Sequence, residues 1–300
     1  MKTGGIKKYD AASKNLIRMV FIINNIIELL TTKIPLGNWV ENLVNFLINN
    51  FSGPLNGFSS FIESIVGGVE AVLAYSHPLV FIAIFALIAW KLKGKKMAVF
   101  VALGLGLVLN LEMWDPLITT LASIITSVLV ALVVGIPVGI IKAHNKWVDL
   151  ITRPILDFMQ TIPPFVYLIP ALMFFGLGNV SGVIATVVFA IAPPIRLTYL
   201  GIQQVDEELE EAGHAFGANW WQILFKIELP GAMPSIMMGI NQCIMLSLSM
   251  VVIAAMIGAG GLGKPVLRSL NVVDIGLGFE AGLGVVIIAM VLDRMFGRDS

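Results

Sequence analysis

The chain has 300 residues, of which 57% are hydrophobic and only 13% are charged, and its formal net charge is zero. Its mean hydropathy is +0.91. Soluble proteins carry about 25% charged residues, so this composition excludes an ordinary soluble domain and predicts an all-α membrane protein. The balanced charge also argues against a nucleic-acid partner, because no basic face is concentrated enough to neutralise a run of phosphates.

The N-terminal region, residues 1–76, differs from the rest of the chain. Residues 15–30 interrupt an apolar run with charged and amide side chains, which favours a helix lying in the membrane plane over one that crosses it. Residues 55–75 repeat this amphipathic pattern. A turn is expected between the two segments, at residues 52–54, where the sequence is Ser-Gly-Pro.

About seven apolar stretches follow, and we predict that each forms a transmembrane helix. They are 77–90, 97–111, 116–141, 155–177, 180–195, 235–257 and 275–292. Residues 97–111 and 180–195 are short against the roughly 20 residues that a helix needs to cross hydrocarbon. We expect two peripheral helices in 77–115 and a five-helix permease-like core in 116–294. An eighth span results if 15–30 also crosses.

The distribution of Lys and Arg predicts the orientation, because cytoplasmic loops carry an excess of both. These residues gather at 91–96, 142–153, 196–226 and 294–298, all on one side of the predicted membrane, whereas 112–115 and 178–180 contain none. Lys264 and Arg268 are the exception. We therefore expect loop 196–234 and the C-terminus in the cytoplasm of a multi-pass plasma-membrane protein. The basic N-terminus conflicts with an odd number of spans, so its side stays open.

Loop 196–234 is polar and separates two apolar stretches. Asp206 is expected to cap a short helix that carries Glu207 and Glu208 in its first turn, near the positive end of the helix dipole. Gly217 is expected to end that helix in the left-handed conformation. Asn219, with Gln222 as its capping-box partner, should then start a second helix.

We expect Pro230 to stop this second helix. Small residues at the bend would let the resulting helix-turn-helix fit closely into a groove on another protein; they are Ala212, Gly213 and Ala215. An ordinary amphipathic surface hairpin is the alternative interpretation.

The loop resembles the cytoplasmic EAA signature of ABC-importer permeases, in which Glu-Ala-Ala is followed by a Gly and then by Ile-x-Leu-Pro at fixed spacing. The matching residues are Glu211, Ala212, Gly217, Ile227, Leu229 and Pro230, and Gly213 stands where the family usually has its second Ala. The resemblance implies that these seven residues couple the chain to a cytoplasmic ABC ATPase. ATP and Mg²⁺ would then bind to that partner.

Residues 156–165 and 239–250 resemble the permeases of glycine betaine and proline betaine importers, and the resemblance covers about residues 39–294. It implies a type I ABC-importer fold, a second copy of the permease as partner, and a separate extracytoplasmic substrate-binding protein. It further implies that the chain, embedded in membrane lipid, takes up osmoprotectants and performs no chemistry itself. No binding domain is expected after residue 292.

Polar residues inside the predicted spans are candidates for the translocation path, because hydrocarbon offers them no hydrogen-bond partners. They are Asn241, Gln242, Ser247 and Ser249, for which interhelical hydrogen bonds are the alternative. A second group is expected to break a helix near one membrane face, so that its freed backbone carbonyls line the same path; it consists of Met159, Gln160, Thr161, Pro163 and Pro164, with Phe165 directly after them. For this group a plain proline kink is the alternative. Phe158, Phe165 and Tyr167 are expected to make weak contacts with a quaternary ammonium head, which cannot donate hydrogen bonds.

Some features of the sequence bear on other classes of function. Residues 258–264 fit the P-loop pattern GxxxxGK, but Pro265 replaces the Ser or Thr that would hold Mg²⁺, so a glycine-rich helix end that permits close packing is expected. Cys243 is the one cysteine and the three histidines are far apart, so neither a disulfide nor a metal site is expected. A secondary transporter remains an alternative, with a membrane-bound enzyme more remote, and choline, carnitine or methionine remain open as solutes.

Overall fold

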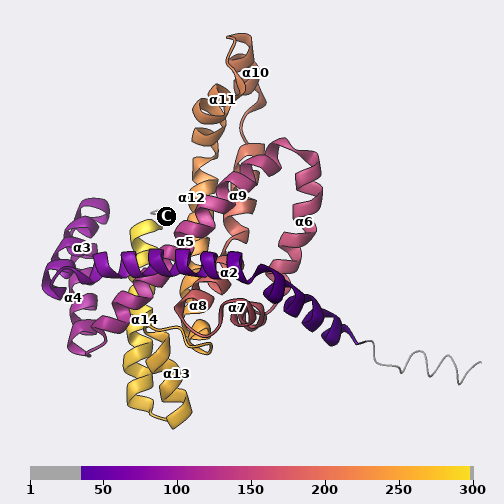
Figure 1. Ribbon diagram of the computed structural model, residues 1–300. Coiled ribbons are helices and arrows are strands. Elements are labelled where there is room, and N and C mark those ends of the chain that lie inside the picture. Colours follow the sequence, from indigo (N-terminus) through magenta and orange to yellow (C-terminus); the bar gives the residue numbers. More distant parts are fainter. Residues whose placement is uncertain (1–34, 298–300) are drawn as a thin grey trace, which may run out of the picture. The chain divides into compact units, whose positions relative to one another are not determined.

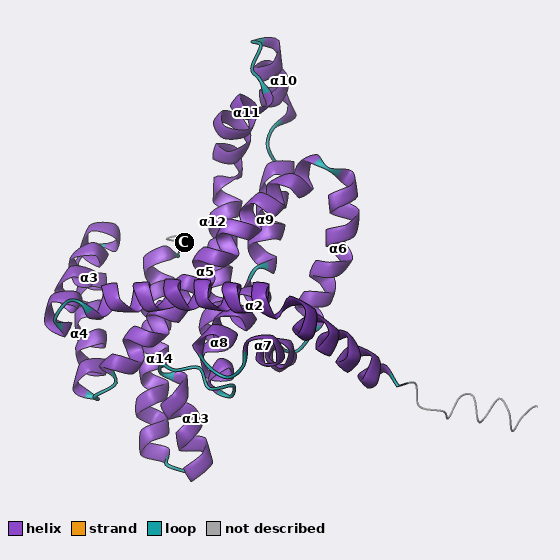
Figure 2. Ribbon diagram, in the orientation of Figure 1, coloured by secondary structure: helices purple, strands orange, loops and turns teal. Residues whose placement is uncertain are grey.

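The computed structural model describes residues 35–297. In this range every regular element is a helix and none is a strand (Figure 2), which confirms the predicted all-α class. The amphipathic segment expected at 15–30 lies outside the described residues. The chain divides into two compact units, of which the first ends at Ser52 and the second begins at Gly53.

Helix α2 (Leu36–Ala74) runs through the boundary between the units and is broken at Phe51, where φ is −119° and ψ is 21°. Pro54 follows three positions later, inside the helix. Proline is tolerated in the first turn of a helix, where no N–H is needed, so Pro54 sits at the start of a new helical segment. The turn predicted at 52–54 is therefore wrong: the chain has a one-residue break instead.

Helices α3 (Pro78–Lys93) and α4 (Lys95–Asn110) pack against each other as a hairpin joined at Gly94, whose φ is 85°. Each has 16 residues. At 1.5 Å per residue each is about 24 Å long, less than the roughly 30 Å of a bilayer's hydrocarbon core. Both were predicted as spans, and both fall short of a full crossing.

The centre of the second unit is built from helices that approach closely at glycines. These are α5 (Trp114–His144), α8 (Asn179–Ala190), α9 (Ala192–Gln203), α12 (Leu229–Ala255) and α14 (Ile275–Phe296) (Figure 1). A Cβ on Gly139 of α5 would lie 2.8 Å from the Ile195 carbonyl oxygen of α9. A Cβ on Gly201 of α9 would lie 3.0 Å from the Ala232 carbonyl oxygen of α12. Small residues thus let α5, α9 and α12 pack backbone to backbone.

The stretch 155–177, predicted as one span, is two helices with a sharp bend. α6 (Lys146–Thr161) is followed by the 3₁₀ helix η1 (Pro164–Tyr167) and by α7 (Leu168–Phe175), and the two limbs differ in direction by 111°. Pro163 and Pro164 supply no N–H groups, so α6 cannot continue through them. The predicted helix break is confirmed, and the stretch forms one span only if the two limbs are counted together.

Five helical segments among residues 35–297 are long and apolar enough to cross a membrane, or six if the bent α6–α7 pair counts as one. They are Leu36–Ala74, Trp114–His144, Asn179–Gln203, Trp220–Ala255 and Ile275–Met295. The expected count of seven is not confirmed. α2, expected as an amphipathic scaffold, is in the set, while α3 and α4 are too short.

The two ends of the second unit carry different short helices. α10 (Glu207–Ala215) and α11 (Trp220–Ile223) project from one end, and α13 (Gly263–Val272) lies at the other (Figure 1). The π-helix η2 (Leu224–Glu228) joins α11 to α12. Only the middle of the predicted loop 196–234, around α10 and α11, therefore projects from the apolar bundle, because its two ends belong to α9 and α12.

Gly139→Ala tests the close α5–α9 contact. The added methyl would lie 2.8 Å from the Ile195 carbonyl oxygen, and overpacking of this kind costs about 1–3 kcal/mol. Gly106→Ala in α4 is the control, because nothing lies within 4 Å of its Cβ position and alanine favours a helix by about 0.5–1 kcal/mol. We expect a lower unfolding temperature in detergent for Gly139→Ala alone. Equal temperatures for the two variants would contradict the packing described.

Candidate functional site

The first arm of the projecting loop is α10, which begins after Asp206 as predicted and carries Glu207, Glu208 and Glu210 in its first turn. The Asp206 side chain accepts no backbone hydrogen bond, so the expected side-chain cap is absent there. The acidic side chains interact with the helix N-terminus through their charge instead.

Gly217 ends α10 as the sequence predicted, with φ at +78°. Its N–H donates to the His214 carbonyl at 2.9 Å, and the Ala218 N–H donates to the Gly213 carbonyl at 3.0 Å. These two bonds form a Schellman motif, which satisfies carbonyls at the helix end. Nothing lies within 4 Å of a Cβ at Gly217, so glycine is needed for its backbone conformation and not for space.

The second arm begins with the predicted capping box. The Gln222 N–H donates to Asn219 Oδ1 at 2.9 Å, and the Asn219 N–H donates to Gln222 Oε1 at 2.8 Å. The predicted stop at Pro230 is wrong, because helix continues from α11 through η2 into α12. The Leu229 N–H donates to the Leu224 carbonyl in a π-turn, and Pro230 enters the first turn of α12, where its missing N–H is tolerated.

The two arms meet at the residue where the chain departs from the EAA signature. A Cβ on Gly213 would lie 2.7 Å from Cδ1 of Ile227 and 3.7 Å from Cγ1 of Ile223. The absent methyl group leaves room for Ile227, so both ends of the signature pack together. Leu229 is half-buried, while Glu211, Ala212 and Pro230 are exposed.

Large apolar side chains at the tip of the loop are uncovered. Phe216 is 93% exposed, directly before Gly217. Trp221 and Phe225 stack with their ring centroids 5.9 Å apart, and both are exposed. Sequence reasoning did not single out these aromatic residues, although their place beside the bend was a usable signal. They form an apolar edge suited to a protein partner.

A buried acidic group lies at the base of the loop and was also missed. The Glu228 side chain is 5% exposed, and the His144 Nε2 atom at the end of α5 is 3.1 Å from its carboxylate. The other ring nitrogen, Nδ1, is 2.9 Å from the Ile140 carbonyl oxygen. The Trp220 and His144 rings pack in a T-shaped arrangement, with their centroids 5.6 Å apart. In the sequence His144 looks like an isolated histidine, because Glu228 is 84 positions away.

Glu210 of α10 interacts electrostatically with Glu228 and His144. Partial burial raises the pKa of the Glu210 carboxyl, and the negative charge of Glu228 raises it further, against the opposing effect of His144. The charged form of Glu210 is therefore disfavoured in the folded loop.

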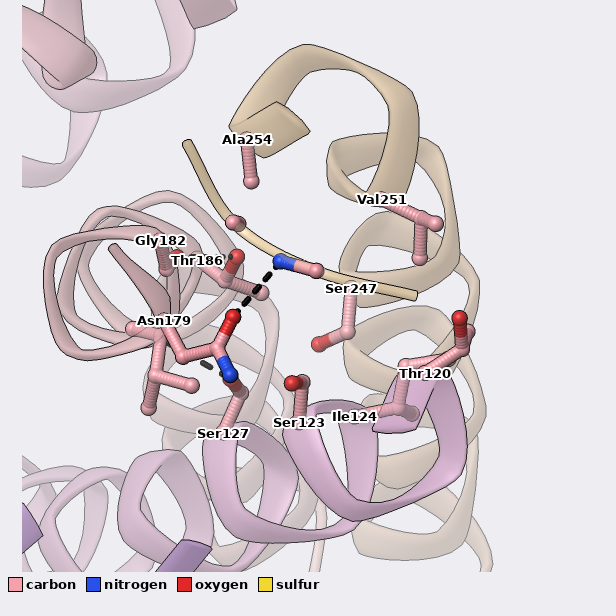
Figure 3. Close-up of a pocket in the computed structure, with 13 residues that line it drawn as sticks. Thr120, Ser123, Ile124, Ser127, Asn179, Gly182, Thr186, Ser247, Val251 and Ala254 are labelled. Atoms are coloured by element: carbon pink, nitrogen blue, oxygen red, sulfur yellow. Dashed lines mark hydrogen bonds between the residues drawn. The ribbon is translucent and has the colours of Figure 1, made fainter. Parts of the chain in front are cut away.

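A second feature is a small polar cavity between α5, α8 and α12 (Figure 3). Its volume is about 30 Å³, enough for one or two water molecules and too small for an organic solute. Its polar lining consists of Thr120, Ser123, Ser127, Asn179, Thr186 and Ser247. Ser247 is the one predicted path residue that lines it, and its hydroxyl also donates to the Cys243 carbonyl at 2.8 Å.

The other predicted path residues of α12 lie elsewhere. Asn241 is half-buried, and its Oδ1 atom has no hydrogen-bond partner among the described residues. Gln242 and Ser249 are exposed, and the Ser249 hydroxyl donates to the Met245 carbonyl at 3.0 Å. The structure thus separates one cavity-lining residue from two that face outward.

Two backbone carbonyls at the bend are hydrogen-bonded within the chain and are not free to line a path. The Met159 carbonyl accepts a hydrogen bond from the Tyr167 hydroxyl, and the Phe158 carbonyl accepts one from Thr161. Tyr167 is 8% exposed and packs in an apolar cluster with Met250 of α12, so it is no aromatic surface for a solute. The predicted path residues Gln160, Pro163 and Phe165 are exposed and Pro164 is half-buried.

The glycine-rich stretch 258–264 closes over the cavity. The Gly260 N–H donates to Asn179 Oδ1 at 2.6 Å, and the Leu262 N–H donates to Thr120 Oγ1 at 2.8 Å. Gly261 has φ at +84°, and a Cβ there would lie 2.3 Å from Thr120 Oγ1. The predicted close helix approach is confirmed, and the stretch follows helix α12 and not a strand. Among residues 35–297 no three His, Cys, Asp or Glu side chains are grouped to hold a metal ion.

The profile of the family described as "binding-protein-dependent transport system inner membrane component" matches residues 135–296. This chain belongs to that family. The match begins within α5 and runs into α14, so it includes the entire projecting loop, and it confirms the family resemblance found in the sequence.

Named relatives extend the comparison over most of the chain. It is 45% identical over 272 residues to the glycine betaine/proline betaine transport system permease protein ProW of Escherichia coli (strain K12), covering 90% of this chain and 77% of the relative. It is 44% identical to the glycine betaine transport system permease protein OpuAB of Bacillus subtilis (strain 168), covering 88% and 93%. It is 47% identical to the glycine betaine/carnitine transport permease protein GbuB of Listeria monocytogenes serotype 1/2a (strain 10403S), covering 87% and 94%.

Solved structures of the inward-facing MetNI methionine ABC transporter share the fold. One matches 61% of this chain and 92% of its own, with a TM-score of 0.58 and 20% identity. A second crystal form matches 59% and 89%, with a TM-score of 0.55 and 21% identity. The protein is therefore a multi-pass inner-membrane component with the type I ABC-importer fold.

Glu210→Gln tests the electrostatics of the loop. A carboxyl whose pKa is higher in the folded state than in the unfolded state costs stability when charged, so the cost is absent below both pKa values and appears as pH rises through them. We expect the variant to gain unfolding temperature over the unmodified protein at about pH 7 and not at about pH 4. Glu208→Gln, which changes an exposed side chain on the same helix, is the control. A gain that is independent of pH would contradict the assignment.

Proposed function

We propose that this chain is the permease subunit of an ATP-driven importer for glycine betaine, proline betaine and similar compatible solutes. The single observation that carries the proposal is the preformed hairpin at 207–230, which carries the EAA signature at one end of a bundle of the importer fold. The solute class rests on relatives that are 44–47% identical and whose names specify glycine betaine.

The hairpin is the proposed docking element for a cytoplasmic ABC ATPase. α10 would enter a groove on that partner through its exposed residues, with Phe216 and the Gly217 bend at its tip. ATP and Mg²⁺ bind to the ATPase in this scheme, and its closure on ATP moves the hairpin. The exposed acidic first turn and the exposed phenyl ring give the docking face both charge and apolar contact area.

The translocation path is proposed to form between two copies of the chain. The cavity within one copy, about 30 Å³, cannot hold such a solute. Gln160, Gln242 and Ser249 are exposed on helices of the bundle, and polar side chains in a membrane need protein or water beside them. A second copy facing these residues would enclose a polar route, which makes them the strongest of the predicted path candidates.

The proposed orientation follows the charge pattern, with the hairpin and the C-terminus in the cytoplasm. The end of the bundle that carries α13 and the 258–264 stretch would then face an extracytoplasmic substrate-binding protein. In this arrangement the substrate-binding protein selects the solute and the permease passes it on. Carnitine is the second candidate solute, because one of the relatives is named for glycine betaine and carnitine together.

Gly217→Pro tests the role of the hairpin. Proline fixes φ near −65° and cannot adopt the +78° found at this bend, so the two arms would lose their relative direction. We expect ATP-driven uptake in reconstituted vesicles to fall to background while membrane insertion is unchanged. Uptake by Gly217→Ala should lie between that of the unmodified protein and that of Gly217→Pro. Gly176→Ala is the matched control, because Gly176 has φ at +75°, open space around it and a place outside the hairpin. Normal uptake by Gly217→Pro would remove the assigned role.

Competition for uptake tests the solute class. Vesicles that hold the permease, its ATPase and its binding protein should take up labelled glycine betaine, and unlabelled proline betaine should compete. Methionine should not compete. Uptake that needs no copurifying ATPase, driven instead by an ion gradient, would favour a secondary transporter and overturn the proposal.

A further inference from the structure

We infer that Glu228 and His144 are positioning residues that join the coupling hairpin to the end of α5. Movement of the hairpin is thereby passed to the bundle. The inference rests on the proposed function and deepens it, because it names where movement of the docking element enters the membrane-embedded helices.

Glu228 is in an unusual place for a carboxylate. Its side chain is 5% exposed, in the π-helix that joins the hairpin to α12. An unpaired buried charge is strongly unfavourable, and His144 is the partner within hydrogen-bond distance among the described residues. The contact with His144 therefore satisfies the buried Glu228 carboxylate and helps to fix the π-helix in place.

The imidazole of His144 is held between two acceptors. Its Nδ1 atom is 2.9 Å from the Ile140 carbonyl oxygen, which can only accept, so this nitrogen carries a proton. Its Nε2 atom faces the Glu228 carboxylate at 3.1 Å. A proton must lie between these two groups as well, either on the imidazole or on the carboxyl. The pair thus forms a hydrogen bond in both protonation arrangements.

Neighbouring residues of the π-helix contact different elements. Ile227 packs against Gly213 of α10, with its Cδ1 atom 2.7 Å from the position of a Cβ. Glu228, the next residue, binds His144 of α5. A shift of α10 is therefore transmitted through one peptide unit to α5. π-turns of this kind occur often at functional sites, because the wider turn redirects side chains.

The last turn of α5 also contacts the segment that precedes the hairpin. Gln203 Nε2, at the end of α9, donates to the Ala143 carbonyl at 3.1 Å. Residues 143 and 144 thus contact the chain directly before the hairpin and directly after it. Glu210 of α10 also interacts with the pair: its pKa is raised first by partial burial and then by the charge of Glu228, while His144 lowers it. The end of α5 acts as a clamp on the root of the hairpin.

The test measures coupling and folding separately. The permease is reconstituted with its ATPase and binding protein, and the number of solutes imported per ATP hydrolysed is determined. Glu228→Leu removes the hydrogen bond, and we expect the ratio to fall about fivefold or more, the scale of typical coupling energies. Glu228→Gln keeps an amide that can donate to a neutral Nε2 or accept from a protonated one, so it should stay within about twofold of the unmodified ratio.

The double variant His144→Phe with Glu228→Leu guards against simple misfolding. Glu228 is buried and the His144 side chain is 28% exposed. Replacing such a polar pair by apolar residues of similar volume leaves no buried charge without a partner, so this protein should keep its unfolding temperature and its ATPase partner. It should nevertheless hydrolyse ATP with a low yield of transport. Glu280→Leu, at an exposed glutamate of α14 outside the hairpin, is the control and should couple normally.

Normal coupling in a folded double variant would overturn the inference and leave the proposed function standing. Failure of the unmodified protein to assemble with an ATPase or to import on ATP would instead overturn the proposed function, and the inference with it. A low ratio in Glu228→Gln equal to that in Glu228→Leu would also count against a hydrogen-bonded link.

Discussion

Hydrocarbon accepts no hydrogen bonds, and this one constraint explains most of what the polar groups of the bundle do. Hydroxyls along the helices donate to carbonyls one turn earlier, as Thr186 does to Gly182 and Ser247 to Cys243. Where a connecting segment enters the bundle, its backbone is satisfied by side chains, as Gly260 is by Asn179 and Leu262 by Thr120. The small hydroxyl-lined cavity lies where these two kinds of bond meet.

The same constraint decides how the backbone departs from a regular helix. At the proline pair after α6, the Met159 carbonyl that α6 releases is taken up by the Tyr167 hydroxyl. At the root of the hairpin, the Leu229 N–H is satisfied through a π-turn directly before Pro230. At each irregularity, another group of the chain therefore forms the hydrogen bond that a regular helix would have supplied. Both lie where the fold changes direction or leaves the bundle, and helices that move against one another would bend at such positions.

Local features of this fold were predictable from the sequence, and long-range ones were not. The Gly217 bend and the Asn219–Gln222 box involve residues within a few positions of one another, so their hydrogen bonds follow from local chemistry. Pro230 was misread, because only the structure shows that a π-turn brings it into the first turn of α12. Hydropathy identified α3 and α4 as apolar but did not show that each ends after 16 residues. The contact between His144 and Glu228 joins residues 84 apart and left no trace in any local pattern.

The Schellman motif and the capping box stand back to back, with Ala218 between Gly217 and Asn219. Every bond that shapes the bend is thus made within the hairpin itself and owes nothing to the helices in the bilayer. Substitutions that reshape the interior for a different cargo would leave the bend unaltered. Permeases with different interiors could then bind the same ATPase through the same hairpin. The solute-contacting surface and the ATPase-binding surface could therefore change independently.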